Sequence, residues 1–187
     1  MTADKETAIL DAMLDLVAER GFHGTPVSQV AKRSGVSAGI IYHYFDSKDA
    51  LIHELYRRIK MDYGRALLAG DPLSLPWPDN LTCVWLNAFR FYVEHPRETL
   101  YLEQYENSPY YDPAHFTNLD ENMGQLAAMI QTEFAAGTVQ ELPFPVLYEL
   151  TLGVALGLAK RQIAGVVVMD ASELEHVAEA CCRAIAK

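Results

Sequence analysis

The stretch Val27–Lys48, VSQVAKRSGVSAGIIYHYFDSK, decides the fold of this chain. Its first part places Val27, Val30 and Ala31 at helical spacing, which predicts a short helix with one buried face. Gly35 interrupts the pattern, as a residue that closes a helix often does. The stretch therefore begins with a short helix that ends in a tight turn.

A second short helix is predicted from Ala38 to Phe45. Ser37 precedes it and can cap it by accepting a hydrogen bond from a free backbone N–H. Ile41 and Phe45 lie four residues apart and form its buried side. The residues left for its other side are Ser37, Ala38, Gly39, Ile40, Tyr42, His43 and Tyr44. Small residues at the start of an exposed helix suit a helix-turn-helix, whose second helix enters the major groove of DNA.

The segment from about Lys5 to Ile59 resembles the N-terminal DNA-binding domain of the TetR (tetracycline-repressor-like) family of transcriptional regulators. The matching residues are GFHGTPVSQVAKRSGV at 21–36 and SAGIIYHYFDSKDALI at 37–52, which include Gly39, Tyr42, Tyr44, Phe45, Lys48 and Leu51. The resemblance implies a homodimeric, ligand-responsive regulator, usually a repressor released from a palindromic double-stranded DNA operator by a small apolar effector. It implies no cofactor and no metal.

The predicted DNA contacts comprise Thr25, Ser28, Ser37, Ala38, Gly39, Ile40, Tyr42, His43, Tyr44 and Lys48. By resemblance, Tyr42, Tyr44 and Lys48 hold the phosphate backbone, which sets register and carries little sequence information. Ile40 suits an apolar contact with a thymine methyl, and its alternative role is to cover the core of the domain. The helix has no Arg or Asn, so strong bidentate base recognition is not available from it.

Thr25 and Pro26 precede the first of these two helices. Thr25 is a good N-cap, and Pro26 at the first helical position needs no N–H partner. Thr25 can also bond a DNA phosphate, and the two roles are compatible. Lys5 can contact a phosphate or remain solvated. The same choice is open for Lys32 and Arg33.

Composition predicts a globular, cytoplasmic protein. The chain has 187 residues, half of them apolar, which is enough for a substantial core. No apolar run reaches the length of a membrane span, and the first ten residues lack a signal-peptide pattern. The net charge is −10, although residues 1–61 hold eight basic and eight acidic residues. The acidic charge of the whole chain argues against indiscriminate nucleic-acid binding, whereas the balance of charge in the first third permits a short, shaped DNA contact there.

The three cysteines, Cys83, Cys181 and Cys182, do not form the pattern of a disulfide framework. The adjacent pair can serve as a redox switch or as small apolar filler, and free cysteines are usually buried.

The remaining pattern predicts an all-α chain of about nine helices, since no segment alternates with period two. After the motif, helices are expected at 49–68, 81–94, 97–106, 116–136, 146–164 and 170–186, with a proline-rich loop at 70–80. We assign residues 1–47 to a helix-turn-helix DNA-binding domain and residues 48–187 to an effector-binding and dimerisation domain.

The last two predicted helices carry apolar stripes that suit a four-helix bundle between two copies, as the family resemblance also implies. The predicted dimer interface comprises Leu150, Val154, Leu158, Arg161, Leu174, Val177, Cys181 and Ile185. The alternative is that these stripes are buried within one subunit.

Aromatic and methionine residues are frequent in the middle helices, where a cavity would suit an apolar molecule. The predicted effector pocket comprises Trp85, Phe89, Tyr92, Tyr101, Glu103, Gln104, Tyr105, His115, Phe116, Met123 and Tyr148. The alternative is that the aromatic residues are ordinary core.

Two other classes of function compete with this interpretation. An enzyme is disfavoured, because the sequence contains no phosphate loop, nucleophile elbow or paired metal-ligand motif. A helical dimerisation protein that does not bind DNA is the second alternative.

Overall fold

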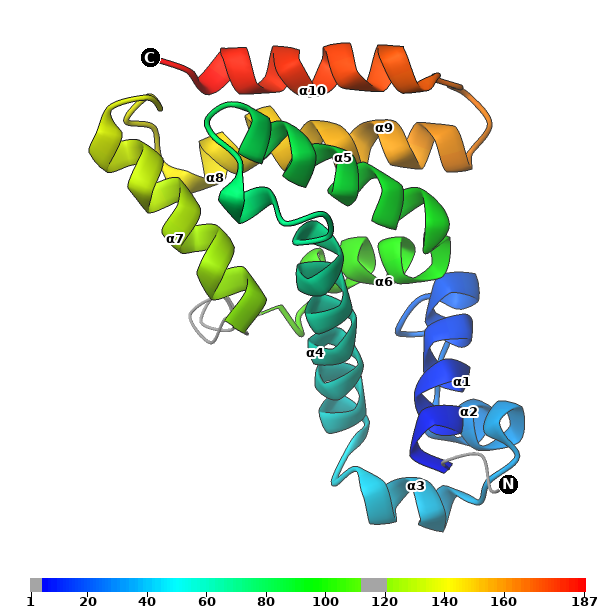
Figure 1. The fold of residues 1–187 in the computed structure, drawn as a ribbon. Coiled ribbons are helices and arrows are strands. Elements are labelled where there is room, and N and C mark those ends of the chain that lie inside the picture. The colour runs from blue at the N-terminus through cyan, green and yellow to red at the C-terminus, as the bar shows by residue number, and fades with distance from the viewer. Residues whose placement is uncertain (1–4, 112–120) are drawn as a thin grey trace. The chain divides into compact units, whose positions relative to one another are not determined.

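The computed structural model describes residues 5–111 and 121–187, and every regular element within them is helical (Figure 1). The elements are α1 (Lys5–Arg20), α2 (Val27–Ser34), α3 (Ala38–Tyr44), α4 (Lys48–Leu67), a 3₁₀ turn (Pro72–Ser74), α5 (Asp79–Glu94), α6 (Pro96–Glu106), α7 (Glu121–Ala136), α8 (Phe144–Tyr148), a π-helical turn (Glu149–Gly153), α9 (Val154–Ile163) and α10 (Ala171–Ile185). Helix α8, the π turn and α9 follow one another without a break and count as one helix. The described residues therefore form nine helices, and the all-α prediction is confirmed.

The contacts divide the chain into two compact units that are not continuous in sequence. Among the described residues, the first unit contains residues 5–60 and 96–111, and the second contains residues 61–95 and 121–187. Helix α4 contributes to both units, and α6 belongs to the first. None of the described helices has the length and apolar character that crossing a bilayer requires.

The core of the first unit joins α1, the helix-turn-helix, the first half of α4 and α6. Tyr101 of α6 is fully buried, and its hydroxyl donates a hydrogen bond of 2.7 Å to the Ile52 carbonyl of α4. The Tyr105 ring stacks on Tyr56 with centroids 3.9 Å apart. On the other side, Gln104 Nε2 donates to the Val17 carbonyl of α1 at 3.1 Å. Helix α6 therefore packs against both α1 and α4 and completes the core of this unit.

The core of the second unit is built around α5. Trp85 is fully buried, stacks on Phe89 with centroids 5.8 Å apart, and donates from Nε1 to the Thr151 carbonyl at 3.1 Å. That carbonyl lies in the π-helical turn, where the regular α-helical bonding pattern is interrupted. Helix α10 begins with a reciprocal capping box between Asp170 and Glu173.

Candidate nucleic-acid interface

Both ends of helix α2 are defined by the backbone, without a side-chain cap at its start. Gly35 has φ of 73°, a left-handed conformation that favours glycine, and its N–H donates to the Ala31 carbonyl at 3.1 Å. The N-cap predicted for Thr25 is wrong. Pro26 holds that position without a side-chain cap, and the buried Thr25 hydroxyl donates back to the Gly21 carbonyl at 2.9 Å. A fully buried side chain offers no surface to a phosphate, so we remove Thr25 from the candidate DNA contacts.

Helix α3 has the start and the buried side that the sequence predicts. The Ser37 hydroxyl accepts a hydrogen bond from the Ile40 amide at 3.3 Å, so Ser37 is the N-cap. Ile41 and Phe45 are buried in the core of the first unit. Together these contacts fix which side of α3 faces outward.

The outward side of α3 brings most of the predicted DNA contacts onto one short surface. Tyr42 and Tyr44 are 52% and 41% exposed, so both rings are open to a partner. His43 is also exposed, and its ring packs edge-on against Tyr44 with centroids 5.6 Å apart. The other exposed members of the predicted set are Ser28, Ser37, Ala38 and Gly39, whereas Ile40 is half-buried.

Lys48 has a structural partner that its sequence position did not indicate. Its Nζ donates to the Phe22 carbonyl at 2.7 Å, which ties the start of α4 to the loop after α1. Partial burial is the main cause that lowers the pKa of this ammonium, and the nearby Asp49 carboxylate opposes the change. An ammonium has three protons to donate, so this bond leaves donors for a phosphate.

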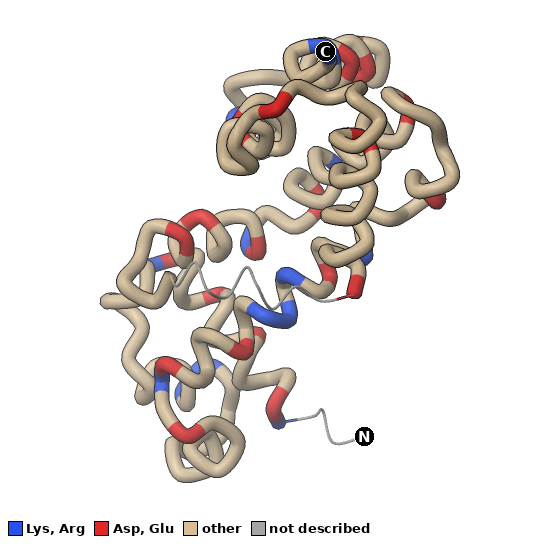
Figure 2. The backbone as a smooth tube through the Cα atoms, turned by 90° about the vertical axis from the view of Figure 1, so that its left-hand side faces the viewer, with Lys and Arg blue, Asp and Glu red and all other residues tan. Residues whose placement is uncertain are grey.

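The interface is electrically neutral at its centre. Helix α3 contains no Lys, Arg, Asp or Glu, and the lowest turns of the tube in Figure 2 are accordingly tan. On α2, Arg33 is engaged by Glu19 of α1, with Nη2 and Oε2 2.9 Å apart. This hydrogen bond is also the main reason that the pKa of Glu19 is lowered. Lys32 and Arg33 are both exposed, but Arg33 is paired with Glu19, so Lys32 is the better phosphate-contact candidate of the two.

Neither unit by itself holds the whole predicted effector-pocket set. Trp85, Phe89 and Tyr92 are buried in the core of the second unit, where Met123 packs against the same cluster. Tyr101, Glu103, Gln104 and Tyr105 belong to α6 of the first unit, Tyr148 is half-buried at the end of α8, and His115 and Phe116 lie outside the described residues. The Tyr92 hydroxyl donates to that of Tyr63 at 2.7 Å, and burial raises the Tyr92 pKa. The buried aromatic residues of this set therefore belong to the hydrophobic cores of the two units, as the alternative interpretation expects.

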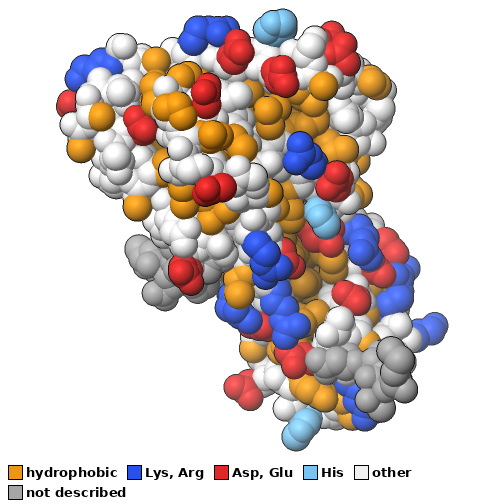
Figure 3. Space-filling view, viewed as in Figure 1, with side chains coloured by type: hydrophobic (Ala, Val, Ile, Leu, Met, Phe, Trp, Pro, Cys, Tyr) orange, Lys and Arg blue, Asp and Glu red, His pale blue; other side chains and the backbone are white. Residues whose placement is uncertain are grey.

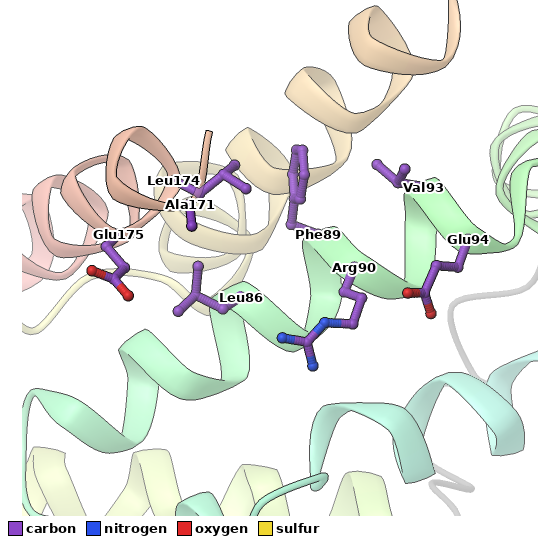
Figure 4. Close-up of a pocket in the computed structure, with 8 residues that line it drawn as sticks. All are labelled: Leu86, Phe89, Arg90, Val93, Glu94, Ala171, Leu174 and Glu175. Atoms are coloured by element: carbon purple, nitrogen blue, oxygen red, sulfur yellow. The ribbon is translucent and has the colours of Figure 1, made fainter. Parts of the chain in front are cut away.

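A small pocket of about 260 Å³ lies between α5 and the start of α10 (Figure 4). Its lining residues are Leu86, Phe89, Arg90, Val93, Glu94, Ala171, Leu174 and Glu175. Only Phe89 was predicted as an effector residue. The others were missed because they become neighbours only when the start of α10 packs on α5, and that packing has no local sequence signal.

An apolar groove of about 430 Å³ lies between the helix of α8 and α9 and the helix α10. It is lined by Leu150, Val154, His176, Val177, Ala180, Cys181 and Ala184, four of which were predicted for the dimer interface. Figure 3 shows that hydrophobic side chains are also spread over the visible face of this unit.

The other predicted interface residues lie elsewhere. The prediction for Ile185 is wrong, because its side chain is 1% exposed and packs inside the second unit with residues such as Leu81 and Val139. Leu158 and Leu174 pack partly against the core, and Arg161 is exposed outside the groove.

The adjacent thiols Cys181 and Cys182 are free and buried, as expected of apolar filler. Burial is the main cause that raises the pKa of both thiols, which keeps them in the less reactive protonated form.

Comparisons with known proteins agree with this architecture. Residues 9–55 match the family model described as bacterial regulatory proteins of the tetR family, and residues 76–186 match that of a tetracyclin repressor-like C-terminal domain. An uncharacterised HTH-type transcriptional regulator of Haemophilus influenzae is 28% identical over 98% of this chain and 97% of its own length. The HTH-type transcriptional regulator BetI of Klebsiella pneumoniae is 42% identical over only 32% of this chain and 31% of its own.

Solved structures show the same fold. A TetR-family transcription regulator from Marinobacter aquaeolei has a TM-score of 0.88 at 24% identity, and the match covers 97% of this chain and 95% of that one. A TetR-family regulator from Haemophilus influenzae has a TM-score of 0.83 at 28% identity, covering 98% of this chain and 97% of the other.

Proposed function

The chain belongs to the TetR family of helix-turn-helix transcriptional regulators, which are not enzymes, and from that premise we propose that it is a ligand-responsive repressor of a palindromic operator. The observation that carries the proposal is the outward side of α3. A short helix is capped at Ser37, anchored through Ile41 and Phe45, and left with two exposed tyrosines and no charge. A regulator of this kind works in the cytoplasm, where bacterial DNA lies.

The phosphate contacts in this proposal come from groups around α3. Tyr42, Tyr44 and His43 carry polar atoms on exposed rings, and Ser28 and Lys32 are exposed on α2. The first helix of a helix-turn-helix crosses the DNA backbone while the second lies in the groove. Lys48 adds an ammonium at the start of α4. Such contacts give affinity and register, and they make binding depend steeply on salt.

A second copy of the chain is the proposed occupant of the apolar groove. Leu150, Val154 and Val177 expose part of their surface there beside the small side chains of Ala180 and Ala184. Small residues let helices from two subunits approach closely, as in a four-helix bundle. A two-fold dimer would present two α3 helices to successive major grooves roughly 34–36 Å apart, which favours a palindromic operator.

The proposed effector site is the pocket between α5 and α10. Leu86, Val93 and Leu174 give it an apolar surface, and Arg90, Glu94 and Glu175 line it with charges of both signs (Figure 4). An effector acts only through a difference in its affinity for the DNA-competent and DNA-incompetent states. Since α4 contributes to both units, it is the proposed element through which occupancy changes DNA binding.

The decisive experiment is selection of bound fragments from genomic DNA, followed by gel shifts between 50 and 200 mM salt. We expect a selected fragment to bind with an affinity that falls steeply with salt. Tyr42→Ala should weaken binding by about tenfold or more, since a hydrogen bond to a charged group contributes about 1.5–3 kcal/mol. Lys187→Ala, which removes an exposed lysine of the second unit, is the matched control and should bind normally.

If no fragment is enriched, or if binding ignores salt, the repressor proposal fails and the DNA-independent dimerisation protein is favoured. The effector proposal is tested separately by thermal unfolding against a panel of small apolar molecules. A ligand present at 100 times its Kd stabilises the protein by about 2.7 kcal/mol. Ala171→Trp, which fills the pocket from an exposed position, should abolish that shift, and a shift that persists in this variant would place the ligand elsewhere.

A further inference from the structure

Helix α3 lacks every side chain that reads a base by paired hydrogen bonds. Arg and Lys read guanine in this way, and Asn and Gln read adenine, but Ala38–Tyr44 contains none of the four. Ser37 caps the helix by accepting the Ile40 amide, and its single hydroxyl proton allows at most one donated hydrogen bond to a base. The surface that would meet the bases therefore has to use something other than bidentate hydrogen bonds.

No contact within the described part of the chain requires a glycine at position 39. The φ of Gly39 is not in the left-handed region, and within residues 5–111 and 121–187 a Cβ built there would meet only the Ser37 hydroxyl, at 3.9 Å. Alanine would therefore fit, and glycine within a helix lowers stability relative to alanine. A glycine that costs stability and leaves open space beside it is expected where another surface must approach the backbone closely.

Ile40 is placed beside that open space and is not an integral core residue. It is half-buried, whereas Ile41 is 1% exposed. Among the described residues, those that are partly buried and pack against the core of the first unit are Val27, Ala31, Val36, Tyr110 and Tyr111, and Ile40 is not one of them. Ala38, one residue before Gly39, is exposed and adds a second methyl group. The tip of α3 thus offers an apolar surface with a gap for close approach.

We propose that this regulator recognises thymines in its operator by packing Ile40 and Ala38 against their C5-methyl groups, with Gly39 admitting the helix backbone to the groove. Thymine is the base that presents a methyl group in the major groove, whereas guanine, cytosine and adenine present polar edges there. An apolar tip would strip water from those polar edges without replacing its hydrogen bonds, which disfavours them. The inference rests on the proposed DNA binding and names the base chemistry of that same site.

The test replaces thymine by deoxyuridine, one position at a time, in the fragment selected by wild-type protein. Uracil keeps the O4 acceptor and the pairing with adenine and lacks only the methyl group. We expect wild-type affinity to fall about fourfold at each contacted thymine, the effect of one buried methyl group. Ile40→Ala should bind thymine and uracil operators alike at the position that Ile40 contacts. Tyr42→Phe, the matched control, should keep the wild-type ratio between the two operators, because it leaves Ile40 in place.

Gly39→Ala gives a second readout with opposite signs for stability and binding. The variant should unfold at a higher temperature than wild type and bind the operator at least tenfold more weakly. Unchanged operator binding by Gly39→Ala would overturn the close approach, and equal affinity for thymine and uracil at every position would overturn the methyl contact. In both cases salt-dependent binding of the selected fragment would leave the proposed function standing. A protein that selects no fragment would overturn the proposed function and this inference with it.

Discussion

The outward side of α3 and the apolar groove beside α10 are built in different ways. The orientation of α3 follows from residues close in sequence: the left-handed Gly35, the Ser37 cap and the buried Ile41. The groove is assembled from residues 150–154 and 176–184, so its composition depends on how distant helices pack. A surface fixed by local rules can be recognised from sequence, whereas a surface made by packing is known only once the packing is known.

The largest effect is expected from Tyr101→Ala. Although the orientation of α3 follows from local residues, the stability of the unit that carries α3 also depends on Tyr101, which is distant in sequence. Tyr101 is fully buried, contacts the Phe22 ring edge-on at 5.4 Å and bonds the Ile52 carbonyl. Its truncation should lower the free energy of unfolding by about 3–5 kcal/mol, as for other buried aromatic residues. Chemical denaturation and operator binding would measure the loss.

Tyr101→Phe is the matched variant, since it removes only the hydroxyl. It should cost about 0.5–1.5 kcal/mol, the net value of a typical hydrogen bond. If Tyr101→Ala is as stable as Tyr101→Phe and both bind DNA normally, the local motif suffices and α6 is dispensable.

Ala180→Glu tests the other side of the comparison. Ala180 is exposed in the single subunit and lines the groove, so a glutamate there leaves the subunit intact. In a dimer that covers the groove it would bury an unpaired charge, which costs about 3 kcal/mol or more and raises the dimer Kd more than a hundredfold. Sedimentation equilibrium would measure the change. Ala128→Glu, at an exposed position of α7, is the control. Identical association of the two variants would rule out the groove as the interface.

The smallest effect is expected from acid titration of Glu54, a residue of α4 in the first unit whose main partners lie on the same helix. Glu54 accepts hydrogen bonds from Arg57 Nε at 2.8 Å and from Arg58 Nε at 2.8 Å, and Arg58 also pairs with Glu6 of α1. The hydrogen bond from Arg57 is the main cause that lowers the pKa of Glu54 from 4.5 to about 2.

A carboxyl group whose pKa is lower in the folded state stabilises that state above its unfolded pKa. The contribution of Glu54 should be fully present above about pH 4.5 and fade as the pH falls toward 2, by about 1 kcal/mol, because solvent screens this partly exposed group. In Glu54→Gln this part of the pH dependence should vanish while operator binding at pH 7 is retained. Urea unfolding at pH 7 and pH 3 would show it. An equal loss on acidification in wild type and Glu54→Gln would assign the effect to other carboxyl groups.

The sequence predicted most of the fold because its signals are local. The Ser37 cap and the buried Ile41 both follow from residues within four positions of one another. The candidate site was predicted less completely. Thr25 was mistaken for a cap because its hydroxyl turns back to the preceding loop, a choice that residue type does not indicate. Ile185 was mistaken for an interface residue because its helical stripe also fits packing inside the unit.

Two gaps in the prediction share one cause. The bond from Lys48 to the Phe22 carbonyl joins residues 26 positions apart, and the pocket beside Phe89 joins α5 to α10. Contacts at such separations leave no periodic pattern in the sequence. They depend on the angle at which helices cross, which side-chain volumes throughout the core determine.

The position of α6 in the first unit means that a minimal DNA-binding fragment is not a prefix of the chain. Cutting after Lys60 would remove Tyr101 and Tyr105 and leave bare the faces of α1 and α4 that these rings cover. Such a fragment would contain the whole helix-turn-helix and still expose an apolar surface that favours aggregation. A stable DNA-binding fragment would need residues 96–111 joined to residues 5–60 through an engineered linker.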